Sequence, residues 1–102
     1  MADPTDIANM AELRQEIDVL DREIVASLKR RVALIDRAIE LKLIEGLPAR
    51  ITHRVEEVVE NVRTEARVHQ IDPDLIEDLW RRLIEWSIAR EERVLGQIGV
   101  VD

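Results

Sequence analysis

The sequence predicts an all-α protein, on three observations. Apolar residues recur every three or four positions over most of the 102 residues, which places them on one face of a helix. The three glycines and three prolines fall near the ends of the chain or between the periodic segments. No stretch shows the alternation of apolar and polar residues that is typical of a strand. We therefore expect three helices per chain, one of them very long.

The first helix is expected to begin near Thr5 or Asp6, either of which can cap it, and to run to about Leu43. Residues 7–43 contain no glycine or proline. The segment 45–48, which reads Glu-Gly-Leu-Pro, then ends the helix, because proline cannot continue it and glycine favours its C-terminal turn.

A second helix fits roughly Ile51 to His69. Its apolar positions follow helical spacing and are Ile51, Val55, Val58, Val59, Val62 and Ala66. Asp72-Pro73 predicts the start of a third helix, with an acidic N-cap followed by proline at the first helical position.

The third helix is expected to run to about Leu95, since Gly96 and Gly99 follow. The last residues, Ile98 to Asp102, are expected to be frayed. The length of the chain predicts a single domain over residues 1–102, with its core at about 6–96.

The first helix is long for a monomer of this size. Thirty-five or so residues extend about 50 Å, whereas a compact 100-residue domain has a radius of gyration of about 13 Å. Part of its apolar face would overhang, and a second copy of the chain can cover it in an intertwined helical homodimer. The alternative is a helix that breaks near its middle and folds back, and residues 7–43 contain no obvious breaker.

Composition excludes several classes of protein. The net charge of −7 and the pI near 4.9 argue against nucleic acid or an anionic membrane as the main partner. The absence of cysteine excludes disulfides and thiolate chemistry. We expect no signal peptide, and the sequence contains no apolar run long enough to span a bilayer. We expect a soluble cytoplasmic protein.

Two cations interrupt the apolar stripe of the first helix. The stripe consists of Leu13, Ile17, Leu20, Ile24, Leu28, Arg31, Ile35, Ala38 and Lys42. Arg31 and Lys42 are eleven positions apart, so both point the same way about 16 Å apart along the axis. Because lysine and arginine are rarely buried without a negative partner, the pair predicts an internal anion.

Arg14 and Arg54 are further candidate cations. Arg14 lies on the first helix but well off the face of Arg31 and Lys42. It could reach the middle of a partner's helix in an antiparallel dimer; taken alone, it reads as a solvated surface residue. Arg54 lies near the start of the second helix, and arginine suits bidentate pairing with a carboxylate. Arg50 and His53 read as loop or outer-face residues.

Ser87 and Glu91 interrupt an apolar line of the third helix that contains Trp80 and Ile84. The alternative interpretation of Glu91 is an ordinary partner for a cation one turn away. The segment 90–93 is otherwise expected to be a solvated face, made of Arg90, Glu92 and Arg93.

Several kinds of site are missing from the sequence. The sequence has two histidines, His53 and His69, and no cysteine or ligand-type spacing, which argues against a metal site. There is no glycine-rich phosphate loop, and Ser87 has no nearby base in sequence. We expect no cofactor. An enzyme of this kind would have to orient a reacting anion and stabilise it electrostatically.

The chain resembles the all-helical chorismate mutase family. The resemblance covers roughly residues 10–95 and rests on joint spacing rather than on one specific motif. The residues that carry it are Glu12-Leu13-Arg14, Ile17, Leu20-Asp21, Arg30-Arg31, Lys42, Arg54, Ile71-Asp72-Pro73, Leu83-Ile84-Glu85-Trp86-Ser87 and Glu91.

The resemblance implies an intertwined dimer with two equivalent sites, each completed by an arginine of the other chain. Arg14 matches that donated arginine, and Arg31 matches the arginine that holds the substrate carboxylates with it. Lys42 matches the lysine that binds near the ether oxygen whose C–O bond breaks. Arg54 matches a further cation of the pocket, and Ser87 a polar residue that contacts a substrate carboxylate.

Three positions depart from the commonest pattern of the family. Glu91 stands where many members have a glutamine that donates a hydrogen bond to the ether oxygen. A carboxyl group donates only when it is protonated, a form that burial favours, and some members have a glutamate there. Val55 stands where typical mutases have a glutamate that binds the ring hydroxyl, and Ile51 replaces a nearby polar residue. Isochorismate pyruvate lyases, which share the fold, also tend to have a valine at the position of Val55.

The leading expectation is therefore the rearrangement of chorismate to prephenate in aromatic amino-acid biosynthesis. The lyase reaction, which gives salicylate and pyruvate, and a mutase reaction on an amino analogue of chorismate stay open. A helical dimerisation module without activity is a fourth reading. In each enzymatic case the partner is a small dicarboxylate, held by Arg14, Arg31, Lys42, Arg54, Ser87 and Glu91, with Ile51 and Val55 lining the site.

Overall fold

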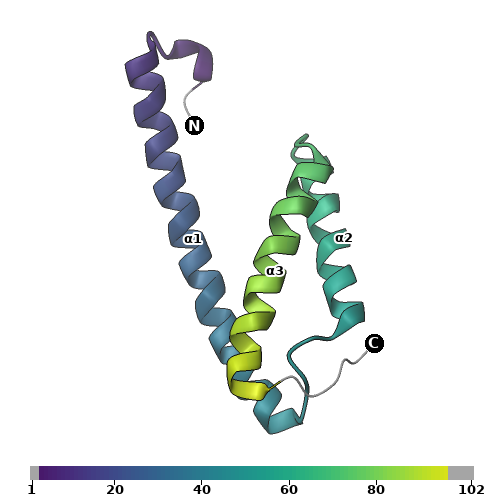
Figure 1. Ribbon diagram of the computed structural model, residues 1–102. Coiled ribbons are helices and arrows are strands. Elements are labelled where there is room, and N and C mark those ends of the chain that lie inside the picture. The colour runs from purple at the N-terminus through teal and green to yellow at the C-terminus, as the bar shows by residue number, and fades with distance from the viewer. Residues whose placement is uncertain (1–2, 97–102) are drawn as a thin grey trace. The chain divides into compact units, whose positions relative to one another are not determined.

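The structure is a computed structural model that describes residues 3–96 of the chain. A short 3-10 helix, η1 (Pro4–Asp6), precedes α1 (Met10–Glu45), α2 (Thr52–Val68) and α3 (Pro73–Leu95) (Figure 1). Residues 3–96 contain no strand, so the all-α prediction is confirmed. The prediction that Ile98 to Asp102 are frayed lies outside the described residues.

Helix α1 begins later than the sequence predicted. The side chain of Asn9 accepts a hydrogen bond from the backbone N–H of Glu12 at 3.0 Å, and the Glu12 carboxylate accepts one from the N–H of Ala8 at 3.1 Å. This reciprocal arrangement is similar to a capping box. The prediction that Thr5 or Asp6 starts the helix is wrong, because both residues belong to η1 instead.

The rest of α1 agrees closely with the pattern. The helix is unbroken from Met10 to Glu45, so the alternative of a break near its middle is wrong. It ends in a left-handed turn at Gly46, whose φ is 70°, and the N–H of Leu47 donates to the carbonyl of Lys42 at 2.9 Å. A residue with a side chain would be strained at this φ, which explains the glycine.

Helices α2 and α3 also match their predicted bounds to within a residue. The Asp72 side chain accepts from the N–H of Asp74 at 2.9 Å, and Pro73 is the first helical residue of α3. The turn between the two helices passes through Gln70, which adopts a left-handed conformation with a φ of 58°. Helix α3 ends at Leu95, directly before Gly96.

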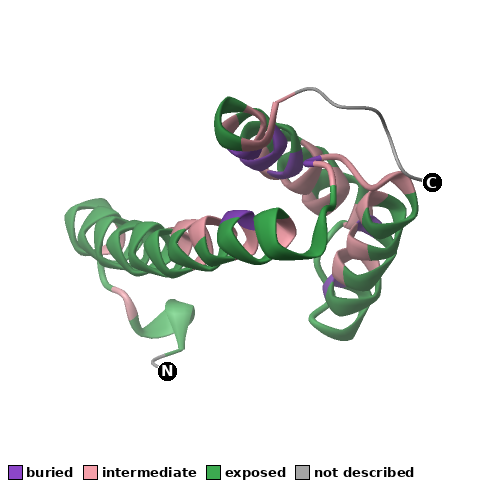
Figure 2. Cartoon of the chain, turned by 90° about the horizontal axis from the view of Figure 1, so that it is seen from below, coloured by how far each residue is buried: buried purple, intermediate pink, exposed green. Residues whose placement is uncertain are grey.

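The chain divides into two compact units, residues 1–34 and 35–102. In the first unit, none of the residues from 3 to 34 is buried (Figure 2). Its large exposed apolar side chains lie on α1 and are Met10, Ile17, Val19, Leu20, Ile24, Val25 and Leu34. This half of α1 therefore has no core of its own within the unit.

The second unit contains the hydrophobic core of the described residues. Helices α2 and α3 lie side by side, and their core cluster consists of Ala49, Val59, Ile84 and Ile88. Val55, Val58 and Leu95 pack against this cluster. The core is aliphatic throughout, as a composition with only 2% aromatic residues requires.

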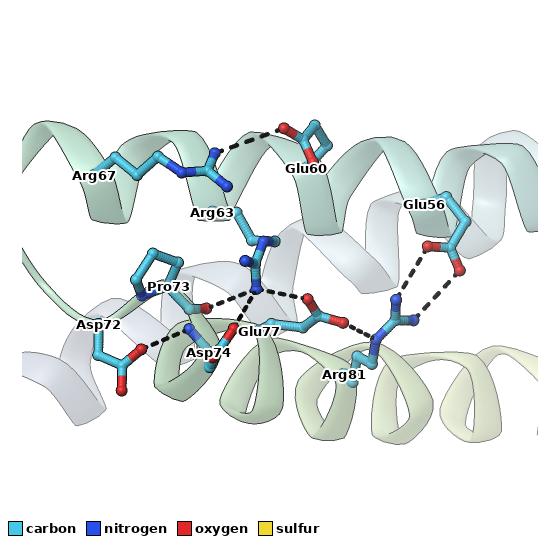
Figure 3. A network of polar contacts seen from close by, with 9 residues as sticks. All are labelled: Glu56, Glu60, Arg63, Arg67, Asp72, Pro73, Asp74, Glu77 and Arg81. Carbon is cyan, nitrogen blue, oxygen red and sulfur yellow. Dashed lines mark hydrogen bonds and ion pairs between the residues drawn. The ribbon is translucent and has the colours of Figure 1, made fainter.

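Ion pairs connect α2 to α3 (Figure 3). One nitrogen of Arg63 lies 2.9 Å from carboxylate oxygens of both Asp74 and Glu77. Arg81 joins Glu77, at 2.7 Å, to Glu56, at 3.0 Å. The hydrogen bond from Arg81 is the main reason that the pKa of Glu77 lies below its ordinary value.

Over residues 3–96, the structure contains no helix with both the length and the apolar character that a bilayer crossing requires.

Candidate active site

Lys42 and Glu91 form a shielded ion pair in the second unit. The Nζ atom of Lys42 lies 2.6 Å from Oε1 of Glu91, and the two side chains are 18% and 5% exposed. Lys42 comes from the last turn of α1, and Glu91 from the C-terminal part of α3. The sequence predicted a negative partner for an inward lysine, and in this structure that partner is Glu91.

The two groups differ in how their hydrogen-bonding capacity is filled. Lys42 Nζ donates to the backbone carbonyl of Ala49 at 2.7 Å. The buried Oε1 of Glu91 accepts no hydrogen bond of suitable geometry from the described residues. Its contact with Lys42 is therefore a contact between charges, and the oxygen retains capacity for a proton or a donor.

Ser87 lies one turn before Glu91 on the same face of α3. It is 3% exposed, and its Oγ donates to the carbonyl of Leu83 at 2.8 Å. Ser87 and Glu91 are the two buried polar residues among residues 3–96. The alternative reading of Glu91, as a partner within its own helix, does not describe this pair, because Lys42 belongs to α1.

The start of α2 contributes two apolar candidates and one cation. Ile51 is the N-cap residue of α2, and Val55 packs against the core cluster; both are half-buried. Arg54 is exposed and pairs with Glu57, one turn later on the same helix. In this structure Arg54 is thus engaged on the surface of α2 and does not join the Lys42–Glu91 pair.

Arg31 and Arg14 lie in the first unit, on the N-terminal part of α1. Arg31 is half-buried, and burial lowers the pKa of its guanidinium from the ordinary value. Arg14 is exposed. Of the predicted site residues, the structure joins Lys42 to Glu91 and aligns Ser87 with Glu91.

Two ion pairs next to these residues escaped the sequence analysis. Arg90, expected on a solvated face, donates from Nε and an Nη atom to Asp36 at 2.6 and 3.1 Å. Arg50, expected in the loop or on an outer face, makes two hydrogen bonds of 2.9 and 2.5 Å with Glu85. The partners are 54 and 35 positions apart, so no local pattern signals either pair.

The described part of the chain contains no group of side chains arranged to bind a metal ion. Residues 3–96 contain no cluster of three or more histidine, aspartate or glutamate side chains that could hold a metal ion. The charged groups next to the buried pair are instead arginines and carboxylates engaged with one another. The chemically distinct group is the shielded ammonium of Lys42, because a positive charge in such a place can stabilise negative charge that develops during a reaction.

Together these features define an all-helical protein with a shielded lysine–glutamate pair between two of its helices. The chain belongs to the chorismate mutase type II family, whose sequence model matches residues 13–92. This match includes Arg14, Arg31, Lys42, Ser87 and Glu91.

Curated relatives fall into two groups. The chain is 36% identical to the T-protein of Haemophilus influenzae and 33% identical to that of Enterobacter agglomerans. These matches cover 82% and 83% of this chain, which spans less than a quarter of either T-protein: 22% and 23% of their lengths.

Two other relatives are matched along most of both chains. The isochorismate pyruvate lyase of Pseudomonas aeruginosa is 30% identical, over 89% of each chain. The chorismate mutase of Methanocaldococcus jannaschii is 26% identical, over 89% of this chain and 92% of its own.

Proposed function

We propose that this protein is a chorismate mutase, which rearranges chorismate to prephenate in aromatic amino-acid biosynthesis. The observation that carries the proposal is the shielded contact between Lys42 and Glu91 in a chain of this family. The family and the archaeal chorismate mutase support this reaction, in which Lys42 would contact the ether oxygen of the bound dicarboxylate.

The proposed chemistry needs no nucleophile. The rearrangement is intramolecular and pericyclic, so the protein must hold the dianion in its compact reactive conformer. Arg31, with Arg14 from a second chain, binds the substrate carboxylates, and Ser87 contacts one of them. Lys42 stabilises the negative charge that develops on the ether oxygen as its C–O bond breaks.

Glu91 takes part as a hydrogen-bond donor, which requires its protonated form. Without substrate, its carboxylate lies 2.6 Å from the ammonium of Lys42. The burial of Glu91 and the position of its carboxylate beside Lys42 support this role.

The working protein is proposed to be an intertwined homodimer in which Arg14 crosses between chains. The exposed apolar side chains of α1 in residues 3–34 support this assembly, because an apolar surface of this extent is costly in water. We further propose that residues 6–96 act as one functional domain. We place the reaction in the cytoplasm, in keeping with a sequence that contains no cysteine.

The second candidate is an isochorismate pyruvate lyase, favoured by the two apolar residues at the start of α2. Val55 and Ile51 offer no group to bind a ring hydroxyl. The lyase of Pseudomonas aeruginosa also matches this chain along most of its length. Such a lyase would hold isochorismate with the same cations and release salicylate and pyruvate.

Incubation of the purified protein with chorismate and, separately, with isochorismate distinguishes the two reactions. We expect prephenate from chorismate, formed with saturation kinetics. Salicylate and pyruvate from isochorismate, with no prephenate from chorismate, would establish the lyase instead. No turnover of either substrate would reject both and favour a dimerisation module.

A further inference from the structure

The ammonium of Lys42 is held by a loop as well as by Glu91. A lysine side chain has a flexible four-carbon stem, so the groups that its N–H atoms contact decide where the charge lies. Lys42 has two polar contacts in the structure, an ion pair with the carboxylate of Glu91 at 2.6 Å and a hydrogen bond to the carbonyl of Ala49 at 2.7 Å.

The carbonyl of Ala49 belongs to the connection between α1 and α2, residues 46–51. The connection is not itself helical, and its position depends on the contacts of individual residues. Ala49 is 4% exposed and belongs to the core cluster with Ile84 and Ile88 of α3. One side of the Lys42 contact is therefore anchored by apolar packing.

The residue after Ala49 adds a polar anchor. Both terminal nitrogens of Arg50 donate to the two carboxylate oxygens of Glu85 on α3, at 2.9 and 2.5 Å. A pair of parallel bonds of this kind fixes direction as well as distance. The peptide between Ala49 and Arg50, which includes the Ala49 carbonyl, is thus tied to α3 one turn and a half before Glu91.

We infer that the Arg50–Glu85 pair is a positioning device that sets the Ala49 carbonyl and, through it, the ammonium of Lys42. Arg50 and Glu85 are positioning residues and touch no substrate in this scheme. The inference rests on the proposed function for its catalytic consequence, whereas its structural part concerns Lys42 alone. Glu85 lies on the exposed side of α3, so its contact with Arg50 is not needed to form the core.

The two variants that remove the device are Glu85→Gln and Arg50→Gln. Their control is Glu56→Gln. Glu56 of α2 accepts two hydrogen bonds from Arg81 of α3, so this change removes another bidentate arginine–glutamate pair of similar exposure. The Arg50 and Glu85 side chains are 34% and 58% exposed, and those of Arg81 and Glu56 are 43% and 60% exposed. Exposed pairs stabilise a fold little, so all three variants should stay folded by circular dichroism.

With chorismate as substrate, we expect Glu85→Gln and Arg50→Gln to lower kcat on the order of tenfold, with KM within about twofold, because a misplacement of 1 Å costs up to about 10²-fold. Glu56→Gln should match the wild type. The charge swap Arg50→Glu with Glu85→Arg should recover part of the kcat that either single change removes. Equal kcat values in Glu85→Gln and Glu56→Gln would overturn the inference.

A second measurement does not depend on turnover. The NMR signals of the Lys42 ammonium and of its adjacent methylene can be assigned by their loss in Lys42→Ala. Their chemical shifts should change in Glu85→Gln and stay the same in Glu56→Gln. A signal that is unmoved in both variants would overturn the inference even if the wild type turned over neither substrate. An inactive wild type in which the signal shifts as expected would reject the proposed function alone.

Discussion

Arg90 binds Asp36 through two hydrogen bonds, from Nε at 2.6 Å and from an Nη atom at 3.1 Å, and so ties the C-terminal part of α1 to α3. The guanidinium of Arg90 also lies 5.5 Å from the centroid of the Trp86 ring. This pair lies directly beside Glu91 in the sequence of α3 and six residues before Lys42 in that of α1. It is therefore a second ion pair, beside Lys42–Glu91, that connects the C-terminal part of α1 to α3.

Ion pairs of this kind predict a loss of stability in acid. Hydrogen bonds from arginines hold the pKa of Asp36 below 3.8, and those of Glu77 and Glu85 below 4.5. The unfolded chain binds protons at these ordinary values, so the stabilisation is complete above them and is lost as the pH falls through the lower folded values. Urea unfolding, followed by Trp fluorescence, should show a midpoint that falls from about pH 4.5 downward.

The triple variant Asp36→Asn, Glu77→Gln, Glu85→Gln is the control for this prediction. It should unfold at lower urea than the wild type at pH 7 and should show a weaker dependence on pH between 5 and 3. A wild-type midpoint that stays constant over this range would mean that these pairs contribute nothing to folding.

Lys42→Ala should lower kcat on the order of 10²–10³-fold, the usual cost of removing one group that stabilises developing charge. The helical content and the oligomeric state should stay as in the wild type, by circular dichroism and light scattering. The matched control is Lys29→Ala, because Lys29 is an exposed lysine of the same helix. Near-normal turnover by a folded Lys42→Ala protein would contradict the proposed role of Lys42.

Glu91→Gln tests the protonation of the buried carboxyl group. If wild-type turnover requires protonated Glu91, kcat falls as the pH rises, since deprotonation removes the hydrogen-bond donor. Glutamine donates at every pH, so this decline should flatten in the variant. The measurement is kcat against pH for both proteins, and identical profiles would exclude Glu91 as the donor.

Mixing two inactive variants tests whether Arg14 crosses between chains. In a dimer of one Arg14→Ala chain and one Lys42→Ala chain, one site lacks both groups and the other retains both. Unfolding and refolding an equal mixture should restore about a quarter of the wild-type activity, because half of the dimers are mixed and each has one intact site. A mixture as inactive as its components would show that Arg14 serves its own chain or none.

Ile88→Ala tests the core of the second unit. Ile88 is 4% exposed and belongs to the cluster with Val59 and Ile84. Its truncation should cost about 2–4 kcal/mol of unfolding free energy. Val94→Ala is the control, because Val94 is 58% exposed and should change stability by no more than about 0.5 kcal/mol. Equal effects of the two changes in urea unfolding would contradict the burial of Ile88.

The sequence by itself determined the helices, because their signals are local. The uninterrupted spacing of α1, the turn at Gly46 and the Asp72-Pro73 start each act within a few residues, and all three appear in the structure. The predicted start of α1 at Thr5 or Asp6 was wrong, although the signal for the true start is local too. The spacing of Asn9 and Glu12 is the signature of a cap, and it prevails over Thr5 and Asp6.

Tertiary structure decided which charges meet. The sequence indicated that Lys42 requires an anion, but only the packing of α1 against α3 within residues 35–96 selects Glu91 for it. The same holds for Asp36 with Arg90 and for Arg50 with Glu85, which are 54 and 35 positions apart. Many surface carboxylates are chemically equivalent partners for a cation. Which one lies within 3 Å depends on how helices distant in the sequence pack, a long-range property that no local spacing records.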